Sequence, residues 1–89
     1  MLKKEITICN KLGLHARAAA KLVTLSSQFK ADLFLHYQDK EVNGKSIMGI
    51  MMLAASKGTS LLLCADGEDE QEAIDAIEKL VKHRFDEES

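Results

Sequence analysis

The sequence has no proline and no tryptophan, and its 89 residues include only one tyrosine and three phenylalanines. The interior therefore has to be aliphatic, built from leucine, isoleucine, valine, methionine and alanine. Long apolar runs are also missing, since no stretch approaches the ~20 residues that a membrane-spanning helix needs. The N-terminal MLKKEITICN has no apolar run typical of a signal peptide. These absences predict a cytoplasmic protein without a membrane segment.

The charge and the cysteines narrow the class further. A formal net charge of −2 lacks the basic excess that general nucleic-acid binding requires, so no nucleic-acid partner is expected. Cys9 and Cys64 lie far apart without the spacing of metal ligands. We expect both to be free, buried thiols in a reducing compartment, and we expect no metal site.

The pattern of apolar residues predicts one domain over residues 1–89. Alternation predicts strands over 2–9, 31–38 and 59–65 and a short strand over 41–43, whereas helical periodicity predicts helices over 16–29, 47–55 and 68–84. The order is β-α-β-β-α-β-α, with short connections that favour antiparallel pairing. We therefore predict an α+β fold, an open-faced β-sandwich with a four-stranded antiparallel sheet and three helices on one face. The acidic residues 86–89 are expected to be a loose tail.

The stretch GLHARAAAKL, residues 13–22, places a histidine and an arginine where a helix is predicted to begin. Backbone amides at a helix start lack intrahelical partners and favour an anion. The same field keeps the ring of His15 neutral and nucleophilic, and Arg17 can bind an anion with two hydrogen bonds. These features suit direct attack of the ring nitrogen on phosphorus. No carboxylate follows in the motif to act as a base, and a neutral imidazole does not require one. An isolated H-x-R pattern is equally compatible with a surface histidine that caps a helix.

The motif G-L-H-A-R at residues 13–17 resembles the active-site signature of HPr, the histidine-containing phosphocarrier family of the bacterial phosphotransferase system. A second block, GKSIMGIMML at residues 44–53, resembles the segment around the regulatory serine of that family. The distance between the blocks, the chain length and the order of elements also agree. The resemblance therefore covers essentially the whole chain and implies the same open-faced fold.

The resemblance implies a role for each matching residue. His15 would accept a phosphoryl group on Nδ1 from phosphorylated enzyme I, itself charged by phosphoenolpyruvate, and pass it to an EIIA-type protein. The side chain of Arg17 and the backbone at Ala16 and Arg17 would hold the phosphoryl oxygens. Such a protein is a stoichiometric carrier and not an enzyme. We expect it to be a monomer without a cofactor.

Two positions qualify the resemblance. The family usually has proline where this chain has Ala18, a change that restores one backbone donor and should be tolerated in the first turn. Ser46 is well placed to cap the second predicted helix, a role worth about 1 kcal/mol. In the family it would also be the site for HPr kinase/phosphorylase, where a phosphate would alter the charge beside the docking face.

The second predicted helix is apolar nearly all round and too short to bury every side. Some of Ile47, Met48 and Met51 should therefore be exposed, and methionine is an adaptable contact residue. We predict that they form a partner docking surface together with Ala16 and Ala20.

Other functions stay open. A regulatory interaction protein of the catabolite-repression type would depend mainly on Ser46 phosphorylation and bind a regulatory protein. A small acylphosphatase-like hydrolase would need a group to position water, for which Asn10 is the only nearby candidate. Within the family, the ending FDEES resembles the nitrogen-related branch and KSIMGIMML the sugar branch.

Overall fold

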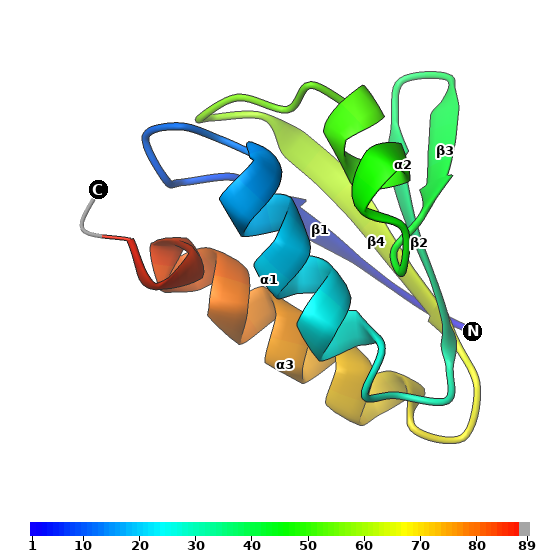
Figure 1. Cartoon of the computed structure of the whole chain (residues 1–89). Coiled ribbons are helices and arrows are strands. Elements are labelled where there is room, and N and C mark those ends of the chain that lie inside the picture. Colours follow the sequence, from blue (N-terminus) through cyan, green and yellow to red (C-terminus); the bar gives the residue numbers. More distant parts are fainter. Residues whose placement is uncertain (88–89) are drawn as a thin grey trace.

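The structure, a computed structural model, describes residues 1–87 and contains the seven elements predicted, in the predicted order (Figure 1). The strands are β1 (Leu2–Thr7), β2 (Asp32–Tyr37), β3 (Lys40–Asn43) and β4 (Ser60–Asp66). The helices are α1 (Ala16–Ser26), α2 (Ile47–Met52) and α3 (Glu70–Lys82). A 3₁₀ turn, η1 (Arg84–Asp86), follows α3 and was not predicted.

The four strands form one antiparallel sheet in the order β1-β4-β2-β3. The first and last strands of the chain therefore lie side by side, with Ile6 opposite Leu61. On the other side of β4, Leu63 lies opposite Leu35 of β2. This register places the apolar residues of neighbouring strands on one face, as their alternation predicts.

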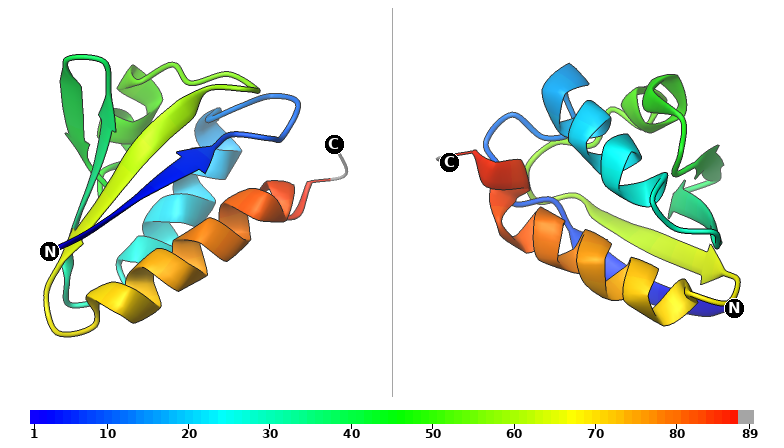
Figure 2. Two further views of the ribbon diagram at one scale, coloured as in Figure 1. Left: turned by 180° about the vertical axis from the view of Figure 1, so that it is seen from behind. Right: turned by 60° about the horizontal axis from the view of Figure 1, so that its bottom comes forward.

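All three helices lie on that face, so the predicted open-faced sandwich is confirmed (Figures 1 and 2). The side chains that fill the space between sheet and helices are almost wholly aliphatic. From the sheet they include Ile6, Leu33, Leu35, Leu61 and Leu63, and from the helices Ala18, Leu22, Ile50, Ile74, Ile77 and Val81. The core thus largely matches the composition, and Phe85 is the one aromatic side chain among residues 1–87 that is fully buried in it.

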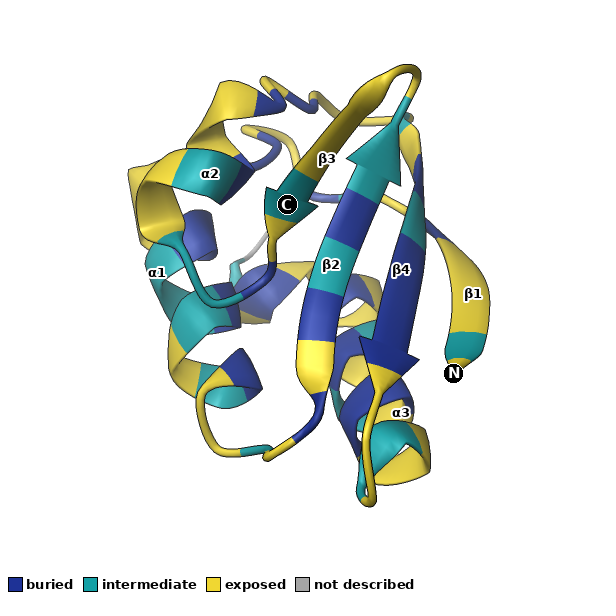
Figure 3. Cartoon of the chain, turned by 90° about the vertical axis from the view of Figure 1, so that its right-hand side faces the viewer, coloured by how far each residue is buried: buried dark blue, intermediate teal, exposed yellow. Residues whose placement is uncertain are grey.

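Within residues 1–87 the opposite face of the sheet carries no helix (Figure 3). Lys3, Glu5 and Thr7 of β1 are exposed there. Cys64 also points to this face, yet it is buried between its cross-strand neighbours Lys3 and Phe34. Burial raises the pKa of the Cys64 thiol above its ordinary value. Cys9 lies beyond the end of β1 and is only half-buried, so the expectation of a buried thiol is confirmed for Cys64 alone; both thiols are free.

All three helices are shorter than their periodicity predicted, and α3 lies two residues inside each end of the predicted range 68–84. α1 ends at Ser26 because the next amides, of Gln28 and Phe29, bond to carbonyls three residues back and tighten the chain into a turn. α2 ends at Met52 in the same way, and Ala54 then adopts a left-handed φ of 51°. In both helices the apolar spacing continues past the point where the backbone leaves the helix.

Within residues 1–87 no helix is long and apolar enough to cross a membrane. The longest, α3, has 13 residues and spans about 20 Å, short of the ~30 Å of a bilayer core.

Candidate functional site

His15 is the N-cap residue of α1, as the sequence predicted. Its backbone is extended, with φ −75° and ψ 179°, and its carbonyl accepts the first helical hydrogen bond from the amide of Ala19. The side chain of His15 does not cap the helix, and the first turn contains no acidic residue. The amides that begin α1 are therefore open to an anion approaching from solvent.

The loop before α1 fixes where His15 lies. Gly13 has a φ of 68°, and a Cβ at this position would lie 2.4 Å from the carbonyl oxygen of Ala55. The next residue, Leu14, donates its amide to the same carbonyl at 2.9 Å and buries its side chain. Only glycine fits so close to the segment after α2. The loop is thereby held against the body of the protein, and the ring of His15 remains about a quarter exposed.

Arg17 is the second residue of α1 and is exposed. It lines a shallow hollow together with Lys21 and Asp86. Within the part of the chain that the structure describes, no carboxylate forms an ion pair with its guanidinium. Arg17 is therefore free to bind an anion at the start of the helix.

The turn η1 brings the chain back against α1 (Figure 2). Arg84, Phe85 and Asp86 have left-handed φ values of 57°, 54° and 62°. Phe85 is fully buried, and its carbonyl accepts a hydrogen bond of 2.6 Å from Nζ of Lys21 on α1. Burial of one phenylalanine and this bond to α1 hold the turn in a backbone conformation that L-residues rarely adopt.

Glu87, directly after this turn, is bonded to the histidine. Its Oε2 lies 2.5 Å from Nε2 of His15, and its Oε1 accepts from Nδ2 of Asn10 at 3.0 Å. Asn10 is fully buried and also donates to the carbonyl of Gly13 at 2.8 Å. Partial burial raises the pKa of Glu87, but the hydrogen bonds from Asn10 and His15 outweigh it and hold the pKa below its ordinary value. A carboxylate is thus kept ionised against the ring.

The expectation of a loose tail over residues 86–89 is wrong for Asp86 and Glu87, while residues 88–89 lie outside those described. The carboxylate beside the histidine was also not predicted, because the motif at residues 13–17 contains none. One signal was present: Phe85 continues the apolar spacing of Ile74, Ile77 and Val81 beyond the charged end of α3. That spacing indicates that the chain stays attached to the core as far as residue 85.

Ser46 is the N-cap residue of α2, as predicted. Its Oγ accepts the amide of Gly49 at 3.1 Å, and its carbonyl accepts the amide of Ile50 at 3.0 Å. The serine is half-buried. Unlike His15, it uses its own side chain to close the helix start.

The predicted exposure of apolar residues on α2 is confirmed (Figure 3). The exposed fractions are 41% for Ile47, 76% for Met48 and 42% for Met51. Ala16 is exposed and Ala20 half-buried on the neighbouring helix α1. Two further exposed apolar residues, Met52 and Leu12, were not predicted. Soluble proteins seldom leave so many large apolar side chains together in water, so this surface is suited to a partner.

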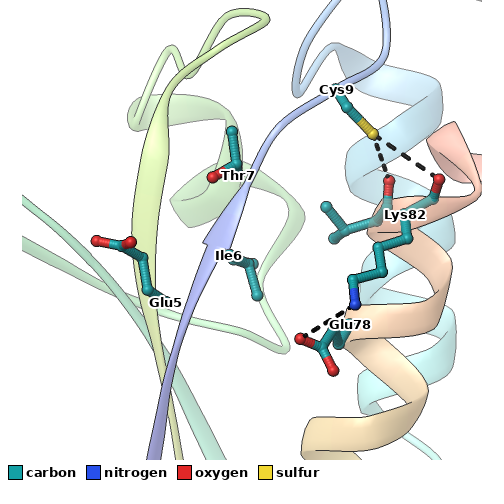
Figure 4. A pocket seen from close by; sticks show the side chains of 7 residues that line it. Glu5, Ile6, Thr7, Cys9, Glu78 and Lys82 are labelled. Atoms are coloured by element: carbon teal, nitrogen blue, oxygen red, sulfur yellow. Dashed lines mark hydrogen bonds and ion pairs between the residues drawn. The ribbon is translucent and has the colours of Figure 1, made fainter.

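A pocket between β1 and α3 is separate from these residues (Figure 4). Its lining includes Ile6 and Cys9, and Sγ of Cys9 donates to the carbonyl of Val81 at 3.0 Å. No predicted site residue lines it. Among residues 1–87 there is also no group of three potential metal ligands.

The arrangement around His15 suits the transfer of an anionic group to a ring nitrogen. Nε2 is occupied by Glu87, and within the described chain no hydrogen bond occupies Nδ1. Open amides and a free guanidinium lie at the same helix start and can neutralise the charge on phosphoryl oxygens. The arrangement can therefore hold an anionic group close to Nδ1 of the ring.

Known proteins resemble this chain over its whole length. Residues 2–83 match the family model described as "PTS HPr component phosphorylation site". A phosphocarrier protein HPr of Xylella fastidiosa is 52% identical over 89 residues, which cover both chains completely. A phosphocarrier protein NPr of Shewanella violacea is 44% identical and covers 99% of this chain and 97% of its own.

The solved structures agree with the fold. The crystal structure of HPr-C-His from Thermoanaerobacter tengcongensis superposes with a TM-score of 0.96 at 46% identity, and each chain is covered completely. A crystal structure of an HPr dimer from the same organism gives a TM-score of 0.79 at the same identity, covering 98% of this chain and all of the other.

Proposed function

Because the chain belongs to the HPr family of the phosphotransferase system and is a carrier protein rather than a catalyst, we propose that it carries a phosphoryl group on Nδ1 of His15. The observation that supports this choice is the state of the ring at the helix start. Nε2 is bonded to Glu87, whereas Nδ1 has no hydrogen bond within residues 1–87. The free nitrogen therefore has its lone pair available for phosphorus.

In the proposed reaction, the lone pair of Nδ1 forms a bond to phosphorus while the bond from phosphorus to a histidine nitrogen of enzyme I breaks. The electron pair of that bond stays with the donor ring. Arg17 and the amides of Ala16 and Arg17 hold the phosphoryl oxygens and neutralise their charge. The reverse exchange, with a histidine of an EIIA-type protein as acceptor, delivers the group.

Enzyme I and the EIIA-type protein would bind in turn to the exposed surface beside the ring. That docking surface consists of Ala16, Ala20, Ile47, Met48 and Met51, and Met52 and Leu12 extend it. Two partners of different shape can use one surface because methionine side chains adapt to what they contact. We propose that the chain works as a single domain, in the cytoplasm, as a monomer; a dimer in solution would contradict the last point.

The test is to incubate the protein with phosphoenolpyruvate and enzyme I and to follow the label. One acid-labile phosphoryl group per chain at His15, passed on to an EIIA-type protein, would support the carrier. Absence of label with an enzyme I that charges a known HPr would contradict it. Running enzyme I of the sugar branch and of the nitrogen-related branch in parallel identifies the donor. We expect faster transfer from the sugar branch, since the HPr relative is 52% identical and the NPr relative 44%.

We further propose that Ser46 is a regulatory phosphorylation site for an HPr kinase/phosphorylase. Its hydroxyl is half-buried and bonded to the Gly49 amide at the start of α2, next to the docking surface. A phosphate there would place about −1.5 to −2 charges beside that surface and weaken docking of an acidic partner, while the helix start tolerates the charge. Incubation with ATP and an active kinase, followed by mapping of the label, tests this. No label at Ser46 would contradict it.

The hydrolase alternative is disfavoured by Asn10. Its amide hydrogens are directed at Gly13 and Glu87, and the side chain is fully buried, so it cannot position a water against bound phosphate. The purely regulatory alternative leaves the arrangement around His15 without a use. The hydrolase predicts no stable label on the histidine, and the regulatory protein gives the histidine only a secondary role, so transfer of the label to an EIIA-type protein separates both from the carrier.

A further inference from the structure

Glu87 reaches His15 from a position 72 residues later in the sequence, and several independent contacts hold it there. Phe85 is buried in the core, and Lys21 binds its carbonyl. Asn10 then holds the carboxylate itself. The side chain of Glu87 is only 15% exposed, which is low for a glutamate so near the end of the described chain. These contacts fix the direction from which the carboxylate meets the ring.

We propose that Glu87 is a positioning residue that keeps the ring proton of His15 on Nε2 and so leaves Nδ1 free to take up the phosphoryl group. This inference rests on the proposed carrier function and adds a residue to it. An ionised carboxylate can only accept a hydrogen bond, so the nitrogen facing it has to carry the proton. In the neutral ring, the other nitrogen, Nδ1, then has a lone pair.

The same contact assists both directions of transfer. When Nδ1 binds phosphorus, positive charge develops in the ring, and the carboxylate 2.5 Å from Nε2 stabilises it. The Nε2 proton stays in place, so accepting the group requires no proton transfer. When the group leaves, the N–P electron pair returns to Nδ1 and the ring is again neutral with its proton on Nε2. The ring therefore has the same tautomer before and after each cycle.

Because of Asn10, the variant Glu87→Gln tests which nitrogen of His15 carries the proton. One amide hydrogen of Asn10 is directed at the carbonyl of Gly13 and the other at Oε1 of Glu87, so Asn10 presents a donor to residue 87. In Glu87→Gln, the amide oxygen would turn to this donor and the amide nitrogen would face His15. A donor facing Nε2 requires an acceptor there, which moves the ring proton to Nδ1 and blocks the reacting nitrogen.

A role in packing alone predicts a different order of variants. Glutamine has the size of glutamate and would preserve packing, whereas alanine would lose it. The tautomer role predicts the reverse, because Glu87→Ala leaves the ring free to adopt the productive form and Glu87→Gln holds it in the unproductive one. We expect the rate of phosphorylation by enzyme I to fall roughly tenfold in Glu87→Gln and by a smaller factor in Glu87→Ala, as loss of one charge-assisted hydrogen bond implies.

The experiment combines transfer rates with the ¹⁵N NMR spectrum of the neutral His15 ring. We expect Nε2–H in the wild-type protein and Nδ1–H in Glu87→Gln. Glu72→Gln removes the same charge from an exposed position on α3 and should match the wild type in both measurements. A Glu87→Gln protein that keeps Nε2–H and transfers at the wild-type rate would overturn the proposal, and so would a Glu87→Ala protein that is the slower of the two.

The two proposals fail in different ways. If His15 of the wild-type protein takes no label, the carrier function is wrong. If His15 is labelled and the glutamine variant matches the wild type in rate and tautomer, only the role of Glu87 is wrong. The NMR measurement needs neither phosphate nor a partner, so it reports on the contact independently of the reaction.

Discussion

The starts of α1 and α2 look alike in the sequence and differ in the structure. Each helix begins after a glycine-containing loop, with a residue that could take a phosphate: His15 before α1 and Ser46 before α2. Ser46 closes its helix with its own hydroxyl, which accepts the amide of Gly49. His15 makes no such bond, and its ring is held instead by Glu87 from the far end of the chain.

The difference separates a helix start that is capped by its own side chain from one that is not. A helix start that its own N-cap side chain satisfies has less capacity to bind an external anion, whereas an open one retains it. Tertiary contacts at α1 hold the ring without using the amides of the first turn. The same local pattern therefore stabilises a helix at α2 and leaves the first amides of α1 open, where we propose that the phosphoryl group binds.

The largest contrast is expected in phosphoryl transfer. His15→Ala should abolish labelling from phosphoenolpyruvate and enzyme I, because it removes the accepting nitrogen. Ser46→Ala should keep the wild-type rate, since the serine hydroxyl takes no part in that step. Acid-labile label per chain measures both. Equal losses in the two variants would contradict the distinction between the helix starts.

The basic residues near the two helix starts, Arg17 and Lys45, should also differ in their effect on the rate of phosphoryl transfer. Arg17→Ala should slow transfer roughly tenfold or more, in line with ~1.5–3 kcal/mol for a hydrogen bond to a charged group, and Arg17→Lys should recover part of the loss. Lys45, before α2, donates to the carbonyl of Phe29 and serves the loop. Lys45→Ala is therefore the matched control. It should transfer at the wild-type rate, and an equally slow Lys45→Ala protein would show that general surface charge is responsible.

Thermal stability should reverse this contrast, because the substitution at Ser46, which leaves transfer unchanged, should lower it. Ser46→Ala removes the N-cap bond to Gly49 and should cost about 1 kcal/mol, lowering Tm by about 4–8 °C for a domain of this size. Ser27→Ala, at an exposed position after α1, is the control and should have almost no effect. Thermal unfolding followed by circular dichroism measures both. A Ser46→Ala protein as stable as the wild type would mean that the cap is not used.

Lowering the pH should weaken the contact of Glu87 at the start of α1 and should leave the start of α2 unchanged. The pKa of Glu87 is held below its ordinary value of 4.5, so the contribution of its contact is present above that pH and is lost as the pH falls through the lower folded-state value. We expect the resonances of Asn10 and His15 to change together with the titration of Glu87 in NMR. The amide of Gly49 should not follow, since no acid lies in the first turn of α2. A parallel change at Gly49 would point to global unfolding.

Strands, helices and the two N-cap residues could be predicted because each depends on local spacing. Alternation identified the buried face of β4, and the position of Ser46 before an apolar run identified its cap. The ends of α1 and α2 could not be predicted, because the apolar spacing continues past the residues where the backbone tightens into turns. The strand order β1-β4-β2-β3 likewise depends on pairing between distant segments.

The contact of Glu87 with His15 could not be predicted from the motif. It requires three consecutive left-handed residues, none of them glycine, and glycine is the residue that usually marks such a backbone. Burial of Phe85 compensates for that conformation, and burial is a property of the folded core. The charged residues of the tail gave the opposite indication, since acidic chain ends are commonly unattached.

The ring atom that carries phosphorus is the most direct measurement of how the site works. In protein labelled with ¹⁵N at histidine and phosphorylated by enzyme I, coupling between ³¹P and ¹⁵N identifies the bonded nitrogen. We expect the phosphoryl group on Nδ1 of His15, with the proton still on Nε2 facing Glu87. Phosphorus on Nε2, or on any residue other than His15, would contradict the conclusion that the open start of α1 and its carboxylate-held ring form the acceptor site.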